Sequence, residues 1–355
     1  MSIATKFFGK FYEGNSTRPS LDTMLAMFDQ ELENFSTLVQ PAPESKPRTP
    51  FDSPHIKPNK FGGMRLSQLP DLLSTMLPLV LKMRQGSKLY DGKFQPTADT
   101  ATPEFFEKLE GLARQDGARD IRYIKVPRNA IFARKGLPYQ NTIIFTVEMD
   151  KDDMSSAPSF DAFLEVAKGY KRMAFISYKI AVLMRKNGFA AYPGTALGGI
   201  TDYTYLGELA GLGAIGYHGL LITPKEGARV RINTIYTNIK NLPIDENSEN
   251  EHLWVRDFCA MCKKCIRQCP VNAIYNQPAP RGDGGMQTID HAACRDYFNQ
   301  YQGCAICLAK CPFSEMGYYK IKARFKGNPK APQFRIPVAS ISDNPKSSVL
   351  KEIPS

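Results

Sequence analysis

The chain has 355 residues, of which 43% are hydrophobic, and a formal net charge of +11. This length is sufficient for two domains, or for one large domain with an inserted module. A membrane-spanning helix needs about 18 to 20 apolar residues; the best candidate, residues 69–81, is short and is interrupted by Pro70, Asp71 and Pro78. A membrane span is therefore excluded. The first residues lack the apolar core of a secretory signal and a twin-arginine pair, so we expect a cytoplasmic protein.

Prolines characterise the first predicted region, residues 1–95, which we expect to wrap around the rest of the chain. Six of them fall between positions 41 and 58, and such a segment favours an extended arm. One helix is predicted in this region, at about 67–84.

A mixed domain of helices and strands is predicted over residues 96–245. Its first helix opens at Thr102 and Pro103, which are typical of a helix start. Strands are predicted where β-branched and aromatic residues cluster, at 121–126, 141–149, 220–223 and 230–238. A long helix is predicted at 160–186, because its apolar and small residues recur at three- and four-residue spacing, at positions 166, 170, 173, 174, 177, 181 and 184. These positions predict one buried face, and Tyr178 lies close to it.

All eight cysteines lie after this domain, in the predicted third region, residues 246–319. They form two groups, each closed by a Cys-Pro pair: Cys259, Cys262, Cys265 and Cys269, then Cys294, Cys304, Cys307 and Cys311. The first group reads C-x2-C-x2-C-x3-C-P, the run of bacterial two-cluster ferredoxins, in which the fourth cysteine ligates the other cluster. We therefore predict one [4Fe-4S] cluster on Cys259, Cys262, Cys265 and Cys311, and a second on Cys294, Cys304, Cys307 and Cys269.

Two local structures are expected around these ligands. The fourth cysteine of each motif should start a helix that leaves its own cluster. Cys294 stands ten positions before Cys304, so a loop at about 295–303 should return it to its cluster. Disulfides would suit a small secreted chain, and zinc ribbons have a different spacing. Disulfides and zinc sites therefore explain the eight cysteines less well than iron–sulfur clusters.

The stretch 194–219 is rich in glycine and contains Gly211-Leu212-Gly213-Ala214-Ile215-Gly216, which matches the G-x-G-x-x-G fingerprint of dinucleotide-binding proteins. The context is wrong for that function. Residues 203–210 before it read as a helix where a strand is required, and no acidic residue follows near position 236. We therefore reject binding of NAD by this motif.

Three segments together resemble the superfamily of reductive dehalogenases and epoxyqueuosine reductases, and the dehalogenases more closely. They are AGLGAIGYHGLLITPKEGARVR (210–231), VRDFCAMCKKCIRQCPVNAI (255–274) and CAICLAKCPFSE (304–315). The resemblance implies an α+β fold: a nitroreductase-like domain that binds a corrinoid, followed by a ferredoxin-like domain with two [4Fe-4S] clusters. It also implies an oxidoreductase in which the clusters reduce cobalamin, bound base-off, for attack on a small substrate such as an organohalide.

The resemblance also implies candidate site residues. In dehalogenases of this family a tyrosine donates a proton and a basic residue stabilises the tyrosinate; by position these match Tyr178 and Arg231, or Arg229. Cobalamin would contact backbone and small side chains of 194–231, with no histidine bound to cobalt, so that His218 is interpreted as structural. The candidate cofactor contacts are Gly194, Thr195, Asp202, Tyr203, Leu212, Gly213, Gly216, His218 and Gly219. Asp202, Tyr203 and Tyr205 stand where other members place residues that contact substrate.

The basic tail, residues 320–355, is the fourth predicted region. It is interpreted as a solvated tail, or as a surface for an acidic electron donor such as ferredoxin or flavodoxin, or for an anionic membrane. Nucleic acid is not expected, because aromatic residues do not alternate with the basic ones.

Three other possibilities remain open. Another large tetrapyrrole or a flavin would occupy the upstream pocket in place of the corrinoid. An electron-transfer protein without corrinoid would keep the clusters alone. A tRNA-modifying enzyme of the epoxyqueuosine reductase kind would use an aspartate such as Asp202 as general acid. Those enzymes continue into helical repeats, whereas a Pro- and Lys-rich stretch follows the cysteines here.

Overall fold

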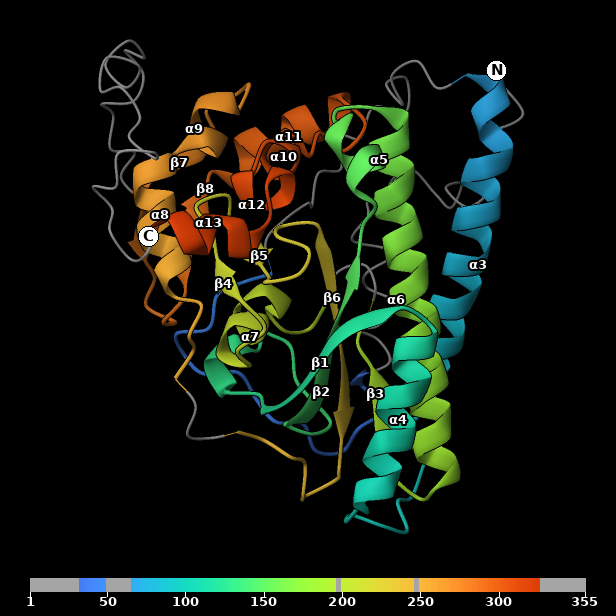
Figure 1. Cartoon of the computed structure of the whole chain (residues 1–355). Helices are drawn as coiled ribbons and strands as arrows, with labels where there is room; N and C mark the ends of the chain where they lie inside the picture. The colour runs from blue at the N-terminus through green and yellow to red at the C-terminus, as the bar shows by residue number, and fades with distance from the viewer. Residues whose placement is uncertain (1–31, 49–64, 196–198, 246–248, 326–355) are drawn as a thin grey trace.

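The computed structural model describes residues 32–48, 65–195, 199–245 and 249–325 (Figure 1). Within these ranges no helix is long and apolar enough to cross a membrane. Most of the basic tail lies outside them; residues 320–325 belong to the last described helix, α13 (Tyr318–Phe325).

Four antiparallel strands form the central sheet, in the order β1-β2-β6-β3. They are β1 (Ala118–Lys125), β2 (Asn141–Glu148), β3 (Ala191–Pro193) and β6 (Val230–Thr237). Strands β1, β2 and β6 confirm the predictions made from β-branched and aromatic residues. The short strand β3 was missed, because three residues are too few to carry a pattern.

Helices cover both faces of this sheet. The 27-residue helix α6 (Phe160–Lys186) packs on one face, with α3 (Leu69–Ser87) and α4 (Pro103–Gln115) beside it (Figure 1). The side chain of Thr102 caps α4 and that of Ser159 caps α6, each by accepting a hydrogen bond from a backbone N–H. The predicted buried face of α6 is confirmed: Met173, Ala174, Ser177, Ala181 and Met184 are buried.

The alternation of side chains along β6 assigns its two faces. A methyl group on Gly169 of α6 would lie 3.2 Å from Arg231, and one on Gly207 of α7 (Tyr203–Leu209) would lie 3.5 Å from Ile232. Since consecutive side chains of a strand point to opposite faces, α6 and α7 cover opposite sides of β6. Asn233 therefore shares the α6 face with Arg231.

The glycine-rich segment folds into a tight hairpin of β4 (Ala214–Ile215) and β5 (Leu221–Ile222). Helix α7 precedes the G-x-G-x-x-G sequence and a strand follows it, which supports the rejection of a dinucleotide site. The glycines serve the hairpin itself. A methyl group on Gly213 would lie 2.1 Å from the carbonyl oxygen of Ile222, and Gly219 has φ of +73°.

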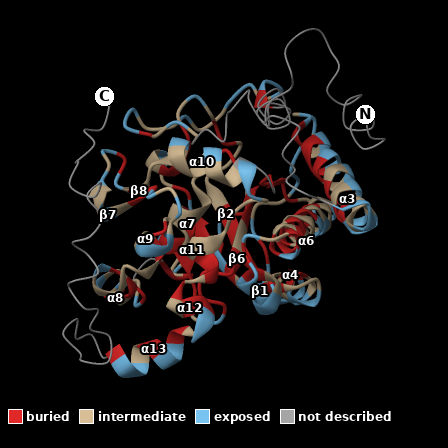
Figure 2. Cartoon of the chain, turned by 90° about the horizontal axis from the view of Figure 1, so that it is seen from above, coloured by how far each residue is buried: buried red, intermediate tan, exposed pale blue. Residues whose placement is uncertain are grey.

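The cysteine-rich region forms a layer of short elements at one end of the sheet (Figures 1 and 2). In chain order they are α8 (Trp254–Cys262), α9 (Lys264–Gln268), β7 (Ile274–Pro280), β8 (Met286–Ile289), α10 (His291–Gln300), α11 (Ile306–Ala309), α12 (Pro312–Glu315) and α13.

Two local predictions in this region need correction. Cys311 starts a helix, α12, but Cys269 ends α9 and leads into strand β7 through a turn at Asn272, whose φ is +51°. The expected loop after Cys294 is largely helical, because Asp290 caps α10 by accepting hydrogen bonds from two backbone N–H groups.

The structure describes residues 32–48 and 65–95 of the first predicted region, and α3 corresponds to the helix predicted at about 67–84. Residues 32–48 lie along the loop that follows β1. Val39 pairs with Leu137 as an isolated bridge, and the N–H of Ala133 donates to the carbonyl of Lys46 at 2.8 Å. These contacts agree with the expected arm; the rest of the segment predicted as extended lies outside the described residues.

We expect Gly213→Ala to lower the free energy of unfolding by about 1–3 kcal/mol, as overpacking a tight contact does. The matched control is Gly111→Ala in α4, where a methyl group meets nothing within 4 Å and alanine should stabilise the helix by up to about 1 kcal/mol. Urea unfolding of both variants measures the difference. Equal stability of the two variants would contradict the assigned role of Gly213.

Candidate functional site

The cysteines of the two motifs interleave in space. Cys259 interacts with Cys262 and Cys311, and Cys294 interacts with Cys269 and Cys304. We call Cys259, Cys262, Cys265 and Cys311 the first cysteine group, and Cys269, Cys294, Cys304 and Cys307 the second cysteine group. Each group contains one cysteine from the other motif, and Cys307 also interacts with Cys311, so the groups are neighbours.

Burial raises the pKa of six of these thiols, and neighbouring cysteines raise it further: Cys259, Cys265, Cys294, Cys304, Cys307 and Cys311. The pKa of Cys294 rises to about 11 and that of Cys311 to about 12. All eight are free cysteines. Such clustered, buried thiols fit an iron–sulfur cluster, whose irons bind them as thiolates.

Backbone N–H groups reach several of these sulfur atoms. The N–H of Ala273 donates to Sγ of Cys269 at 3.3 Å. The backbone N–H of Tyr217, in the β4–β5 hairpin, bonds to Cys259 and opposes the rise of its pKa. The hairpin of the upstream domain thus touches the first cysteine group directly.

A second constellation lies between α6 and the start of β6. The guanidinium carbon of Arg231 lies 4.8 Å from the centre of the Tyr170 ring, and the side-chain stem of Arg231 packs over Gly169. No hydrogen bond to Nε of Arg231 is found within the described chain, and this atom is buried. A cation over the face of a tyrosine is attracted by the ring and would also stabilise its phenolate.

Asn233 adds an unpaired donor to the same face. Its Oδ1 accepts from the N–H of Thr234 at 2.9 Å, while its buried Nδ2 has no hydrogen-bond partner in the part of the chain that the structure covers. Oδ1 of Asn233 lies 2.7 Å from where a methyl group on Gly194 would be. Buried donors without partners are rare, so Arg231 and Asn233 together suit a ligand with hydrogen-bond acceptors.

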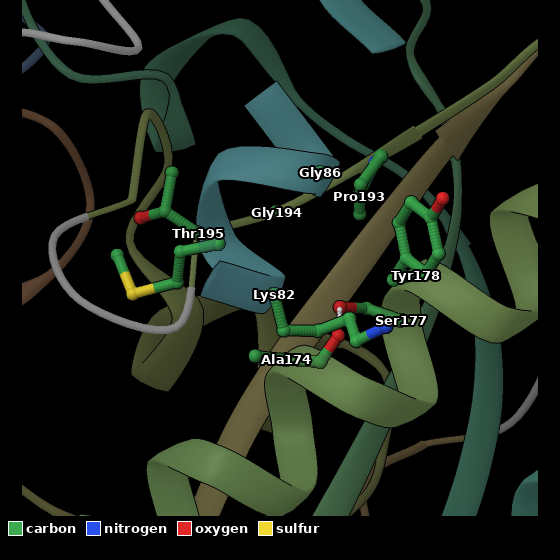
Figure 3. Close-up of a pocket in the computed structure, with 9 residues that line it drawn as sticks. Lys82, Gly86, Ala174, Ser177, Tyr178, Pro193, Gly194 and Thr195 are labelled. Atoms are coloured by element: carbon green, nitrogen blue, oxygen red, sulfur yellow. Dashed lines mark hydrogen bonds between the residues drawn. The ribbon is translucent and has the colours of Figure 1, made fainter. Parts of the chain in front are cut away.

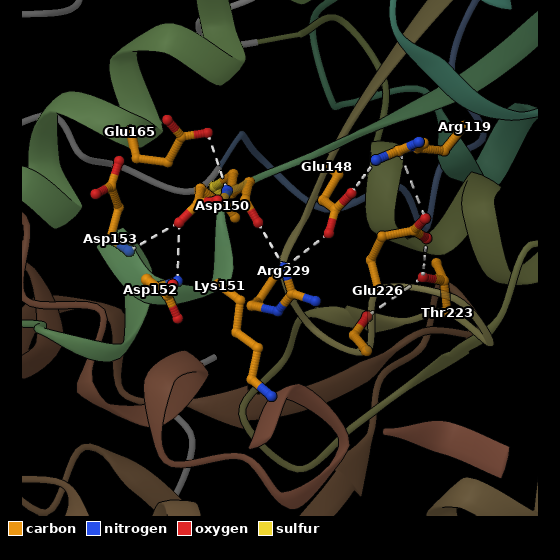
Figure 4. A network of polar contacts seen from close by, with 12 residues as sticks. Arg119, Glu148, Asp150, Lys151, Asp152, Asp153, Glu165, Thr223, Glu226 and Arg229 are labelled. Atoms are coloured by element: carbon orange, nitrogen blue, oxygen red, sulfur yellow. Dashed lines mark hydrogen bonds and ion pairs between the residues drawn. The ribbon is translucent and has the colours of Figure 1, made fainter. Parts of the chain in front are cut away.

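A network of ion pairs and hydrogen bonds centred on Arg229 and Glu148 lies next to Arg231 in the β2–β6 pair (Figure 4). Nη1 of Arg229 donates to Glu148 at 3.0 Å and to the carbonyl of Met149 at 2.6 Å. Burial would raise the pKa of Glu148, but hydrogen bonds from Arg229 and Arg119 hold it below its usual value. From α6, Arg172 donates to Glu165 and to the carbonyl of Glu148. The network thereby ties α6 to the ends of β2 and β6.

The expected pairing of Tyr178 with Arg231 is not what the geometry favours. Tyr178 stands eight residues beyond Tyr170, about 12 Å along α6 and roughly 80° around it. Together with two predicted cofactor contacts, Gly194 and Thr195, it lines a crevice of about 10 Å³ between α3, α6 and the end of β3 (Figure 3), which has room for about one water molecule. Nζ of Lys82 lies 4.5 Å from the centre of its ring. A catalytic role for Tyr178 stays a prediction, and Tyr170 is the candidate that the sequence reasoning missed.

The alternative basic residue, Arg229, is already bound to Glu148, which leaves Arg231 as the better match. Asp202 is also engaged. Its Oδ1 accepts from the N–H of Tyr205 at the start of α7, and its Oδ2 lies 2.5 Å from Nζ of Lys46. Tyr203 donates its hydroxyl to the carbonyl of Thr195 at 3.2 Å, close to Gly194.

The remaining predicted cofactor contacts belong to the β4–β5 hairpin. Leu212 is buried, and Gly213, Gly216 and Gly219 are explained by packing within the hairpin or against β8. His218 is buried, which lowers its pKa to about 4, and its Nδ1 accepts from the N–H of Leu220. Cofactor contact by these residues remains a prediction.

Comparison with known proteins finds a matching family in the cysteine-rich region and relatives that cover part of the chain. Residues 252–275 match the model of the 4Fe-4S binding domain family. The tetrachloroethene reductive dehalogenase of Dehalobacter restrictus is 37% identical over 198 residues, which cover 51% of this chain and 34% of that protein. The epoxyqueuosine reductase of Vibrio cholerae is 31% identical over 117 residues, 31% of this chain and 30% of that protein. The matched region thus spans about a third of each relative.

Solved structures give the same fold. The catabolic reductive dehalogenase NpRdhA in complex with 3-bromo-4-hydroxybenzoic acid has a TM-score of 0.59 at 20% identity, over 72% of this chain and 40% of that chain. A reductive dehalogenase whose structure suggests a mechanism for B12-dependent dehalogenation also has a TM-score of 0.59, at 20% identity, over 71% of this chain and 40% of that chain.

Fold and site together define an α+β iron–sulfur protein with a ferredoxin-like [4Fe-4S] region. The predicted resemblance is confirmed: the chain is homologous to reductive dehalogenases over about half its length and, over a shorter stretch, to epoxyqueuosine reductases.

The cysteine grouping predicts which double variants lose which ligands. In Cys259→Ser/Cys311→Ser both changes fall in the first cysteine group, so about four iron atoms should remain per chain. In Cys259→Ser/Cys269→Ser, each group loses one ligand, and both sites should be impaired. Iron and sulfide analysis after anaerobic reconstitution distinguishes them. If instead Cys259→Ser/Cys269→Ser keeps about four iron atoms and Cys259→Ser/Cys311→Ser loses both sites, each motif holds its own cluster.

Proposed function

We propose that this protein is a cytoplasmic, corrinoid-dependent iron–sulfur reductase of the reductive dehalogenase kind. Two [4Fe-4S] clusters, one on each cysteine group, pass electrons to cobalamin, bound base-off, and a small substrate such as an organohalide is reduced. The observation that carries the proposal is the Arg231 guanidinium over the Tyr170 ring, beside two interleaved cysteine groups. The homologous dehalogenases and the B12-dependent mechanism suggested for one structural neighbour support it.

The residues at the start of β6 fit a corrinoid. Cobalamin carries many amide oxygens and a phosphate, which are hydrogen-bond acceptors, and Nε of Arg231 and Nδ2 of Asn233 are buried donors without partners among the described residues. Gly194 lies beside Asn233 in a tightly packed position, because a methyl group there would lie within 2.5–2.7 Å of Thr234, Tyr203 and Asn233. When bound, cobalamin supplies the redox-active metal that takes electrons from the clusters and reduces the substrate.

Tyr170 holds the proton that the reduced substrate needs. A tyrosine side chain is a weak acid, so transfer of its proton requires a nearby cation that stabilises the phenolate. Arg231 provides this, because it lies over the ring and no carboxylate among the described residues forms an ion pair with it. The polar network of Arg229, Glu148 and Arg172 ties α6 to β6 and so keeps Tyr170 beside Arg231. Figure 4 shows the Arg229 part of this network.

The geometry gives less support to the tRNA-modifying alternative. Asp202, the candidate general acid, caps α7 and forms an ion pair with Lys46, so its carboxylate is held as an acceptor. An electron-transfer protein without corrinoid is the alternative that cofactor analysis decides.

Replacing Tyr170 by phenylalanine should reduce the rate of substrate reduction by about 100-fold or more, the usual contribution of a general acid. Tyr178→Phe is the matched control, since it removes the same hydroxyl from the same helix, and it should retain most of the activity. Steady-state reduction of a halogenated phenol or ethene, with reduced viologen as donor, measures both. If Tyr178→Phe alone abolishes activity, the original assignment is right and the Tyr170 assignment is wrong.

Anaerobic reconstitution with iron, sulfide and cobalamin should give about eight iron atoms and one cobalt per chain. Asn233→Leu should lower cobalt retention without changing iron, because it removes one donor outside the cluster region. Metal analysis and the corrinoid absorption band measure both. Eight iron with no cobalt would refute the corrinoid proposal and favour the electron-transfer alternative.

A further inference from the structure

The two cysteine groups face different parts of the upstream domain. The second cysteine group lies toward α6: a methyl group on Gly303, next to Cys304, would lie 3.6 Å from the ring of Phe163. Phe163 and Tyr170 are seven residues apart, so they share one face of α6 about 10 Å apart. The second cysteine group is therefore on the side of the Tyr170–Arg231 pair.

Three members of the first cysteine group lie on α8 and α9, at one edge of the cysteine-rich layer, and the fourth, Cys311, lies at the start of α12 (Figures 1 and 2). Lys263 and Lys264 separate Cys262 from Cys265 in the sequence, and Nη1 of Arg267 donates to the carbonyl of Cys262 at 3.0 Å. Three basic residues therefore lie directly beside Cys262 and Cys265.

Much of this charge is uncompensated. Nζ of Lys263 bonds to the amide oxygen of Asn276, and Arg267 bonds to a backbone carbonyl; within the described ranges neither forms an ion pair with a carboxylate. Lys264 does pair, with Glu315 at 2.7 Å. Residues 259–325 contain nine Lys or Arg against four Asp or Glu, so the layer as a whole is basic.

A groove of about 370 Å³ lies beside this edge, between α8, the β4–β5 hairpin and the β7–β8 hairpin. Lys263, Arg256 and Asp257 line it together with Tyr217, the residue whose backbone N–H bonds to Cys259. A partner seated there would lie directly against the first cysteine group.

We propose that α9 and the end of α8, with Lys263 and Arg267 as the main charges, form the docking surface for a small acidic one-electron carrier protein. The proposal deepens the proposed function and rests on its cluster part only. In each encounter the reduced carrier gives one electron to the oxidised cluster of the first cysteine group, which passes it to the cluster of the second. No bond is made or broken and no proton is required.

The test uses the full chain with its clusters reconstituted, and a reduced two-cluster ferredoxin of strongly negative net charge as the probe. Arg267→Glu should lower the second-order rate constant of cluster reduction by about tenfold at low ionic strength, and the difference should shrink as salt is added. Lys108→Glu is the matched control: it is the same change of charge at an exposed position of α4, at the far end of the molecule.

Reduction by dithionite at high ionic strength and the midpoint potentials of the clusters should be the same in both variants. A slower reaction with the ferredoxin but unchanged potentials supports docking. Equal ferredoxin rates for Arg267→Glu and Lys108→Glu, or a loss explained by a shifted potential, overturn the proposal. If Arg267→Glu fails to assemble clusters, Lys263→Glu takes its place. Because only cluster reduction is measured, the result does not depend on whether the protein binds cobalamin.

Discussion

The antiparallel pairing of β2 with β6 is the constraint on which the candidate site depends. The register sets Val147 opposite Arg231 and Glu148 opposite Val230, and the N–H of Met149 donates to the carbonyl of Arg229 just beyond the last pair. A shift by one residue would turn Arg231 to the α7 face. The ion pairs of Arg229 and Glu148 lie at the same point, and Arg172 connects it to α6. One strand pairing therefore determines both which arginine is available and which tyrosine it meets.

The cysteine-rich layer shows a second constraint, the exchange of one cysteine between the two motifs. Cys311 joins the first cysteine group and Cys269 the second, so neither site can be completed by a continuous stretch of chain. Aromatic packing of Phe258, Phe313 and Trp254 supports the exchange near Cys311. The β4–β5 hairpin and the turn at Gly227 then fit against this layer; a methyl group on Gly227 would lie 2.3 Å from the carbonyl oxygen of Phe313. This close approach couples the layer to the upstream domain.

The glycine-rich segment shows how a motif can be mistaken for a ligand site. Gly213 and Gly216 are required because β5 passes directly over them, and Gly219 because the chain turns with positive φ. By contrast, the donors that suit a cofactor, on Arg231 and Asn233, come from an ordinary strand with no recognisable signature. Whether these two donors are free to bind a ligand depends on whether neighbouring elements supply hydrogen-bond acceptors for them.

The sequence by itself determined the main strands and the long helix with its buried face, and it predicted the assignment of the cysteines to interleaved groups. These features follow from local periodicity and fixed ligand spacing, which are written along the chain. It did not reveal that Cys269 leads into a strand or that α10 is a helix, since neighbours and caps decide such short elements. Tyr170 was already on the predicted buried face of α6, but only tertiary structure placed Arg231 over it and turned Tyr178 toward Lys82. The physical reason is that a side chain's partner across two elements depends on strand register and helix rotation, and neither is encoded in the spacing of residues within one element.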